Sequence, residues 1–154
     1  WRIGYAAGPA ELIAAMTSIQ SHSTSNPTSI AQKAAIEALT GSQESVNVMV
    51  KEFKKRRDYL VERLRALPGV ECPLPDGAFY AFPKISAAFG KDAGSGPINS
   101  SQAFAEQLLQ QAHVALVPGS AFGIEGYVRL SYATSMENLE KGMDRIEAFW
   151  QRLV

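Results

Sequence analysis

Two arginines, Arg2 and Arg129, lie in segments whose other residues are typical of buried strands. A guanidinium removed from water needs an anionic partner, because an unpaired buried charge is costly. Its planar fork of donors matches two carboxylate or phosphate oxygens at once, which a lysine ammonium cannot do. We therefore interpret both arginines as candidate anion-binding residues. In the alternative interpretation, strand alternation simply points each side chain to solvent.

The other reactive side chains give no comparable indication of a functional site. Cys72 has no histidine or glycine-rich helix start near it in sequence, so we expect no nucleophilic role. His22 and His113 are too few and too far apart in sequence to indicate a metal site. Tyr80 and Tyr132 occupy expected strand positions, where most tyrosines are core residues with a satisfied hydroxyl. We assign none of the five a catalytic or metal-binding role.

Helical periodicity predicts five helices around these arginines. They are expected over residues 10–22, 30–39 and 42–67, from Asn99 or Ser100 past Leu109, and over 134–150. Ser42 is the expected N-cap of the third and longest helix. Thr134 with Glu137 forms a capping-box pattern that predicts the start of the last helix.

Short strands are expected between the helices, over residues 1–8, 70–72, 78–83, 114–117 and 127–132. A turn at 75–77 joins the second and third, and a glycine-flanked loop at 118–123 joins the last two. Residues 90–96 are expected to form a surface loop without chemistry. The fold class is thus α/β with mixed helices and strands: a small sheet with flanking helices.

The composition limits the partners of the chain. Its 154 residues include 15 basic and 15 acidic side chains, so no net charge attracts nucleic acid or an anionic membrane. Acidic residues interrupt the basic run at 51–57, which indicates a solvated helix face. No apolar run is long enough to cross a bilayer, and a single cysteine fits a reducing, cytoplasmic setting. We expect a soluble protein whose partners are small molecules.

Five segments resemble the class I aminotransferases of the aspartate and aromatic type, in the order in which that family carries them. They are WRIG at 1–4, STSNPTSIAQ at 23–32, PDGAFY at 75–80, VPGSAFG at 117–123 and YVRLSYA at 127–133. The first resembles the end of the family signature, in which a lysine, then a glycine and a variable residue precede the arginine. The resemblance covers essentially the whole chain.

The resemblance implies a fold-type-I enzyme with pyridoxal 5'-phosphate as its cofactor. Arg2 matches the arginine that binds the cofactor phosphate, and Arg129 matches the one that binds the substrate α-carboxylate. Asn26 and Pro27 fall in a segment that, in relatives, approaches the active site of the neighbouring subunit, which implies a homodimer. The loop at 119–123 resembles one that lies near the substrate.

The family's Schiff-base lysine and the aspartate that pairs with the pyridine nitrogen would lie upstream of Arg2 and are not in this sequence. Transamination requires that lysine amine. We therefore expect this chain to be the C-terminal portion of an aminotransferase and to be inactive alone, with no catalytic residue of its own. Residues 1–41 would end the large cofactor-binding domain, and 42–154 would form the small domain.

The implied reaction exchanges an amino group between an amino acid (aspartate, an aromatic amino acid or similar) and a 2-oxo acid. Two alternatives remain open at this point. Relatives with the same signature perform lyase chemistry or sense effectors in transcription regulators, and Arg129 would bind a carboxylate there as well. The isolated chain would otherwise be a non-catalytic binding module.

Overall fold

The computed structural model describes residues 2–154, which divide into two units. The first unit ends at Asn47, and the second comprises Val48–Val154. Within the described residues, no helix combines the length and apolar character that crossing a membrane requires.

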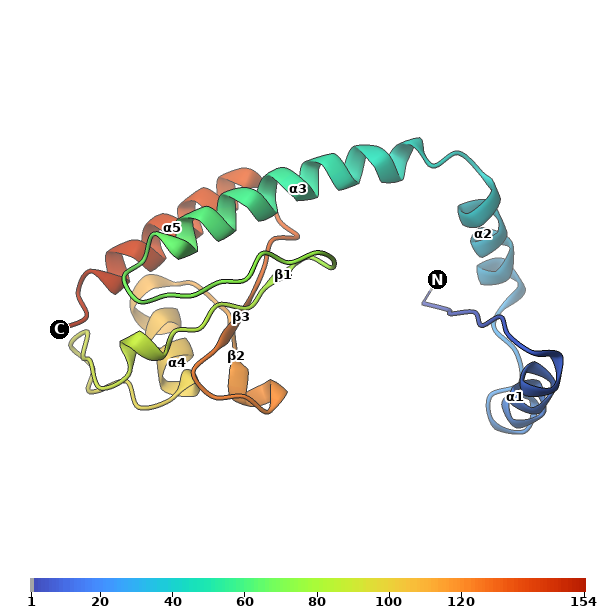
Figure 1. The fold of residues 1–154 in the computed structure, drawn as a ribbon, viewed down its shortest axis with the longest axis horizontal. Coiled ribbons are helices and arrows are strands. Elements are labelled where there is room, and N and C mark those ends of the chain that lie inside the picture. The colour runs from blue at the N-terminus through green and yellow to red at the C-terminus, as the bar shows by residue number, and fades with distance from the viewer. Residues whose placement is uncertain (1) are drawn as a thin grey trace. The chain divides into compact units, whose positions relative to one another are not determined.

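The first unit contains two helices, α1 (Ala10–Ser23) and α2 (Ser29–Thr40), shown in blue in Figure 1. Pro9 precedes α1, where its missing N–H costs no helical hydrogen bond. The hydroxyl of Thr28 accepts a hydrogen bond from the Ala31 N–H and so caps α2, which ends before Gly41. The sequence-based expectation of helices at 10–22 and 30–39 is confirmed.

The strand expected over residues 1–8 is wrong for the described part, because residues 2–9 form an irregular segment. Trp1, with which that strand would begin, lies outside the described residues. A strand is defined by hydrogen bonds to a neighbour, and no strand pairs with this segment within residues 2–154. Its aromatic and branched residues have the propensity, but propensity alone forms no ladder.

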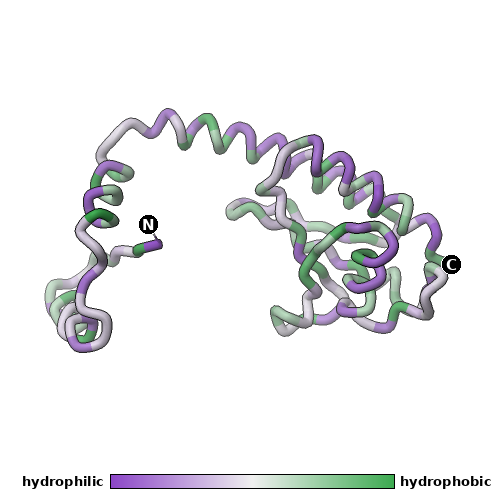
Figure 2. The backbone as a smooth tube through the Cα atoms, turned by 180° about the vertical axis from the view of Figure 1, so that it is seen from behind, coloured by the Kyte–Doolittle hydropathy of each residue, from purple (hydrophilic) through white to green (hydrophobic). Residues whose placement is uncertain are grey.

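Apolar side chains of the first unit are mostly exposed. Ala31 is the one buried residue among those described up to Asn47. Exposed apolar residues recur along both helices, among them Leu12, Met16, Ile19, Ile30 and Ile36. Figure 2 shows hydrophobic positions in green along α2. The first unit by itself therefore has almost no hydrophobic core.

The longest helix, α3 (Glu44–Arg65), begins in the last residues of the first unit and continues into the second. The hydroxyl of Ser42 accepts a hydrogen bond from the Glu44 N–H at 3.3 Å, so Ser42 acts at the start of the helix as expected. Leu60, Val61 and Leu64 are buried near its C-terminal end. The helix ends two residues before the predicted position 67.

Three short antiparallel strands form the sheet, in the order β1-β3-β2. They are β1 (Tyr80–Ala81), β2 (Val117–Pro118) and β3 (Val128–Ser131). The expected strands at 78–83 and 127–132 are present but shorter, and the strand expected at 114–117 overlaps β2 only at Val117. Residues 70–72 contribute only a single bridge from Glu71 to Lys84. Prolines limit the ladder, since Pro73, Pro83 and Pro118 have no N–H to donate.

Helices α4 (Ser101–Ala112) and α5 (Met136–Trp150) complete the second unit, together with short 3-10 helices η1 (Ser86–Ala88) and η2 (Gly119–Phe122). Ser100 caps α4 through the Ala103 N–H, as one of the two expected caps. The capping box of Thr134 and Glu137 is wrong. Ser135 is the N-cap of α5 and accepts from the Asn138 N–H, because the helix begins one residue later than the pattern suggested.

The core of the second unit lies between the sheet and the helices α3, α4 and α5. It includes Leu60, Leu64, Phe104, Leu108, Val128, Leu130, Met143, Ile146 and Phe149. Helices α3 and α5 run side by side in Figure 1, and the Arg63 guanidinium joins them by ion pairs to Asp144 and Glu147. Those pairs raise the pKa of Arg63, with the Glu147 hydrogen bond as the largest cause. The expected class, mixed α/β, is confirmed.

Candidate functional site

Arg129 lies in the middle strand, β3, on the face opposite the core. Burial alternates along the strand, with Val128 and Leu130 buried and Arg129 partly exposed. The pairing register places Val117 of β2 beside Arg129 and Tyr80 of β1 beside Ser131. Tyr80 is therefore the diagonal neighbour of Arg129 on the same face of the sheet.

Two aromatic rings hold the Arg129 guanidinium. Its central carbon lies 4.3 Å from the centre of the Tyr80 ring and 4.5 Å from the centre of the Phe122 ring. Cation–π contacts at this range contribute roughly 0.5–2 kcal/mol each, depending on desolvation. Phe122 in turn meets Phe82 edge to face, with ring centres 6.0 Å apart. The sequence interpretation gave Tyr80 no role and did not identify either ring as a partner of Arg129.

The donors of Arg129 remain available for a ligand. Ring contacts engage the faces of a guanidinium, whereas its N–H groups point outward in its plane. Within residues 2–154, no hydrogen bond or ion pair uses the Arg129 guanidinium. By contrast, Arg56 also contacts a ring, that of Phe53, but is paired with Glu52 at 3.2 Å. Arg129 is thus a positioned cation whose fork faces no protein carboxylate in the described part of the chain.

The loop that carries Phe122 has a tightly folded backbone. The Gly119 N–H donates to the Tyr127 carbonyl at 2.7 Å, and the Ile124 N–H donates to the Gly119 carbonyl at 3.1 Å. A Cβ on Gly119 would lie 2.5 Å from the Ile124 carbonyl oxygen, so only glycine fits there. Gly123 ends η2 at φ +79°, a conformation that favours glycine. The loop is therefore an ordered connection between β2 and β3.

Glu125 attaches this loop to the first residue of α4. Its carboxylate accepts hydrogen bonds from the Ser101 N–H at 2.9 Å and the Ser101 hydroxyl at 2.8 Å. The Ser101 Oγ also accepts from the Ser120 N–H at 3.3 Å. Hydrogen bonds from Ser101 hold the pKa of the Glu125 carboxyl below its usual range, and the bond from the Ser101 backbone N–H contributes most. The sequence interpretation identified neither residue, because they are 24 positions apart.

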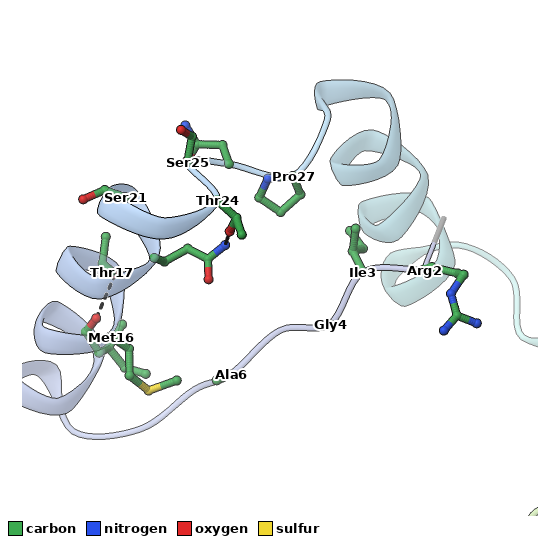
Figure 3. A pocket seen from close by; sticks show the side chains of 13 residues that line it. Arg2, Ile3, Gly4, Ala6, Met16, Thr17, Ser21, Thr24, Ser25 and Pro27 are labelled. Carbon is green, nitrogen blue, oxygen red and sulfur yellow. Dashed lines mark hydrogen bonds between the residues drawn. The ribbon is translucent and has the colours of Figure 1, made fainter.

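Arg2 is exposed and lies in the irregular N-terminal segment of the first unit. Its guanidinium points away from α1 in Figure 3. The expected burial of this side chain in a strand is therefore wrong. Arg2 nevertheless borders a hollow of about 640 Å³, which is lined by both polar and apolar groups. Its lining includes Thr17, Ser21, Ser25, Asn26 and Pro27.

The remaining candidates behave as ordinary structural residues. Cys72 is buried, and burial raises the pKa of its thiol, which disfavours the nucleophilic thiolate. Tyr132 is buried beside the core, and its hydroxyl donates to the Ala78 carbonyl at 3.0 Å. Arg2 and Arg129 belong to different units of the chain.

The fold and the ordered motifs belong to one family. The family model described as aminotransferase class I and II matches residues 1–146, and the chain belongs to this family. The resemblance inferred from the sequence is confirmed.

Individual relatives are similar over nearly the whole chain. The aspartate/prephenate aminotransferase of Cereibacter sphaeroides is 53% identical over 150 residues, which are 97% of this chain and 38% of that protein. The aspartate aminotransferase of Rhizobium meliloti is 47% identical over 154 residues, 99% of this chain and 38% of that protein. The chain thus spans 38% of the length of these relatives.

Solved structures show the same fold. The crystal structure of the Rhizobium meliloti aspartate aminotransferase superposes with a TM-score of 0.93 at 46% identity, covering 100% of this chain and 39% of that one. The aromatic aminotransferase from Pyrococcus horikoshii gives a TM-score of 0.80 at 40% identity, covering 94% and 37%. The expectation of a partial fold-type-I aminotransferase is confirmed.

Proposed function

We propose that the complete protein is a pyridoxal-phosphate-dependent aminotransferase that exchanges an amino group between an amino acid and a 2-oxo acid. Aspartate and aromatic amino acids are the proposed amino donors, since relatives that are 53%, 47% and 40% identical carry those names. The observation that carries the proposal is Arg129, whose guanidinium lies between two rings and has no ion-pair partner among residues 2–154, in a chain of this family. The chain by itself is proposed to be inactive, because the family lysine is not in its sequence.

Arg129 would bind the α-carboxylate of the substrate. Two N–H groups on one edge of the fork can donate to the two carboxylate oxygens, which sets both position and orientation. The rings of Tyr80 and Phe122 restrict rotation of the guanidinium, so less freedom is lost when the substrate binds. A substrate held in this way presents its α-carbon in a defined place, which is a large part of catalysis.

Arg2 would anchor the phosphate of the cofactor. The hollow beside it is bordered by Thr17, Ser21 and Ser25, but the Thr17 and Ser21 hydroxyls already donate to the Ile13 and Ser18 carbonyls at 2.8 Å. The Arg2 guanidinium is therefore the group that suits the phosphate end of the cofactor, and the chain offers no lysine upstream of Arg2 for its other end. When bound, pyridoxal phosphate supplies the electron sink for chemistry at the α-carbon.

The arrangement of the complete protein is part of the same proposal. Residues 1–41 would end the large domain, and 42–154 would form the small one. The complete enzyme would be a homodimer in which Asn26 and Pro27 approach the neighbouring active site, and it would reside in the cytoplasm. Similarity to aminotransferases along essentially the whole chain supports these assignments.

An acceptor-dependence assay tests the reaction type. The complete protein, supplied with pyridoxal phosphate and aspartate, should form more than one equivalent of oxaloacetate per cofactor only when a second 2-oxo acid is added, because the amino group must then be passed on from the cofactor. Release of ammonia without an acceptor would point to the lyase alternative. Absence of turnover with aspartate, phenylalanine and tyrosine would reject the proposal in favour of a sensing or binding role.

A further inference from the structure

A carboxylate outside the proposed substrate site holds the loop that covers Arg129. Ser101 is fully buried at the start of α4, and both its N–H and its hydroxyl donate to Glu125. Its Oγ accepts from the Ser120 N–H, which belongs to η2. Glu125 also accepts from the Gly126 N–H at 3.4 Å. Ser101 therefore joins the two ends of the loop at 119–126, Ser120 through its Oγ and Glu125 through the carboxylate.

Phe122 depends on this attachment for its position. Its side chain is 47% exposed. Its ring contacts the Arg129 guanidinium and, edge to face, the ring of Phe82. A side chain with so little packing is placed mainly by the backbone that carries it. That backbone is the four-residue η2, between Gly119 and Gly123.

We propose that Glu125 is a positioning residue for substrate recognition: through Ser101 it holds η2 so that Phe122 covers one face of Arg129. This inference rests on the proposed function of Arg129. Tyr80 covers the other face from the sheet, where its position is set by pairing with Ser131. Of the two rings, only Phe122 is held by a loop, so the carboxylate acts on that side of the guanidinium. Loss of the attachment would leave Arg129 free to rotate and more fully hydrated.

The expected kinetic signature is a weaker affinity for carboxylates with a smaller change in turnover. Removing one ring contact should raise the KM for aspartate and the inhibition constant of succinate about three- to tenfold, the range of one partly desolvated cation–π contact. Succinate carries carboxylates but no amino group, so it reports binding alone. A purely structural role of Glu125 would instead lower the Tm and leave both constants unchanged.

A double-mutant cycle in the complete protein tests the inference. The variants are Glu125→Ala, Phe122→Ala and the combination, with Glu137→Ala on the surface of α5 as the control expected to match the unmodified protein. Both single variants should raise the two constants, and the combination should raise them no further than Phe122→Ala alone. Independent, multiplicative effects, or unchanged constants in Glu125→Ala, would overturn the inference.

Two further variants separate the possible failures. Glu125→Gln keeps one acceptor for Ser101 and should fold even if the alanine variant does not; a partial rise in the constants is expected, and none would contradict the inference. If Arg129→Ala weakens carboxylate binding while the Phe122 and Glu125 variants do not, only this inference fails. If Arg129→Ala itself has no effect, the proposed function fails.

Discussion

For Arg129, the sequence predicts an anion-binding role and the structure adds the residues that position its guanidinium. A cation inside a strand pattern indicated an anion site from sequence alone, and pairing in β3 places it on the sheet face away from the core. Its two aromatic partners come from positions 80 and 122, which adjoin it only through the register and the loop. No local pattern encodes such contacts. Arg2 shows the reverse, since its strand-like neighbours form no strand within the described residues.

The ionisation of Glu125 gives a test at the same scale. Hydrogen bonds from Ser101 hold the pKa of this carboxyl below its usual range, and the largest effect comes from the Ser101 backbone N–H. A lowered pKa means that the stabilisation is complete above the ordinary pKa and is lost as the pH falls through the folded-state value. The difference in Tm between the protein and Glu125→Gln should therefore shrink as the pH falls below about 4.5, the usual pKa of a glutamate carboxyl. Thermal unfolding at stepped pH measures it, and a constant difference would contradict the assignment.

At the scale of elements, helices were predicted better than strands. The 3.6-residue periodicity is clear in α3, α4 and α5 and weaker in α1 and α2, and local caps such as Ser100 reinforce it. Strand lengths depend on partners elsewhere in the chain and on prolines that interrupt the ladder, so β1 and β2 extend for only two residues each. The start of α5 was misplaced by one residue because Thr134 and Ser135 are both competent caps.

The end of α4 offers an element-scale prediction. His113 is the C-cap and is held in the left-handed conformation at φ 55°, which costs a residue with a Cβ about 1–2 kcal/mol. His113→Gly should raise the free energy of unfolding by about 0.5–1 kcal/mol, the remainder being lost to the flexibility of glycine in the unfolded chain. Denaturant unfolding measures the change.

Its control is Gln110→Gly, at an exposed position inside the same helix. There the glycine should destabilise by about 1 kcal/mol, because the backbone is already in an unstrained helical conformation. Equal effects of the two glycines would contradict the role assigned to the cap.

At the scale of the whole molecule, the two units differ in how much hydrophobic core each contains. The second unit has a continuous core, whereas residues 2–47 of the first include one buried residue and many exposed apolar side chains. The sequence interpretation placed a boundary at residue 41, and the compact units divide between Asn47 and Val48, inside α3. A helix shared by two units carries no sequence signal of a boundary, since its periodicity continues through the division.

The role of Arg129 tests the account most directly, by steady-state kinetics of the complete protein with aspartate. Arg129→Ala should lower kcat/KM by at least about thirtyfold, since truncating one partner of a hydrogen-bonded charge pair costs about 2–5 kcal/mol. Arg129→Lys should recover only part of this, because an ammonium cannot bind both oxygens. The matched control is Arg56→Ala, which removes a ring-stacked but ion-paired arginine and should change kcat/KM by less than about twofold. If Arg129→Ala changed kcat/KM as little as Arg56→Ala does, the account would be contradicted.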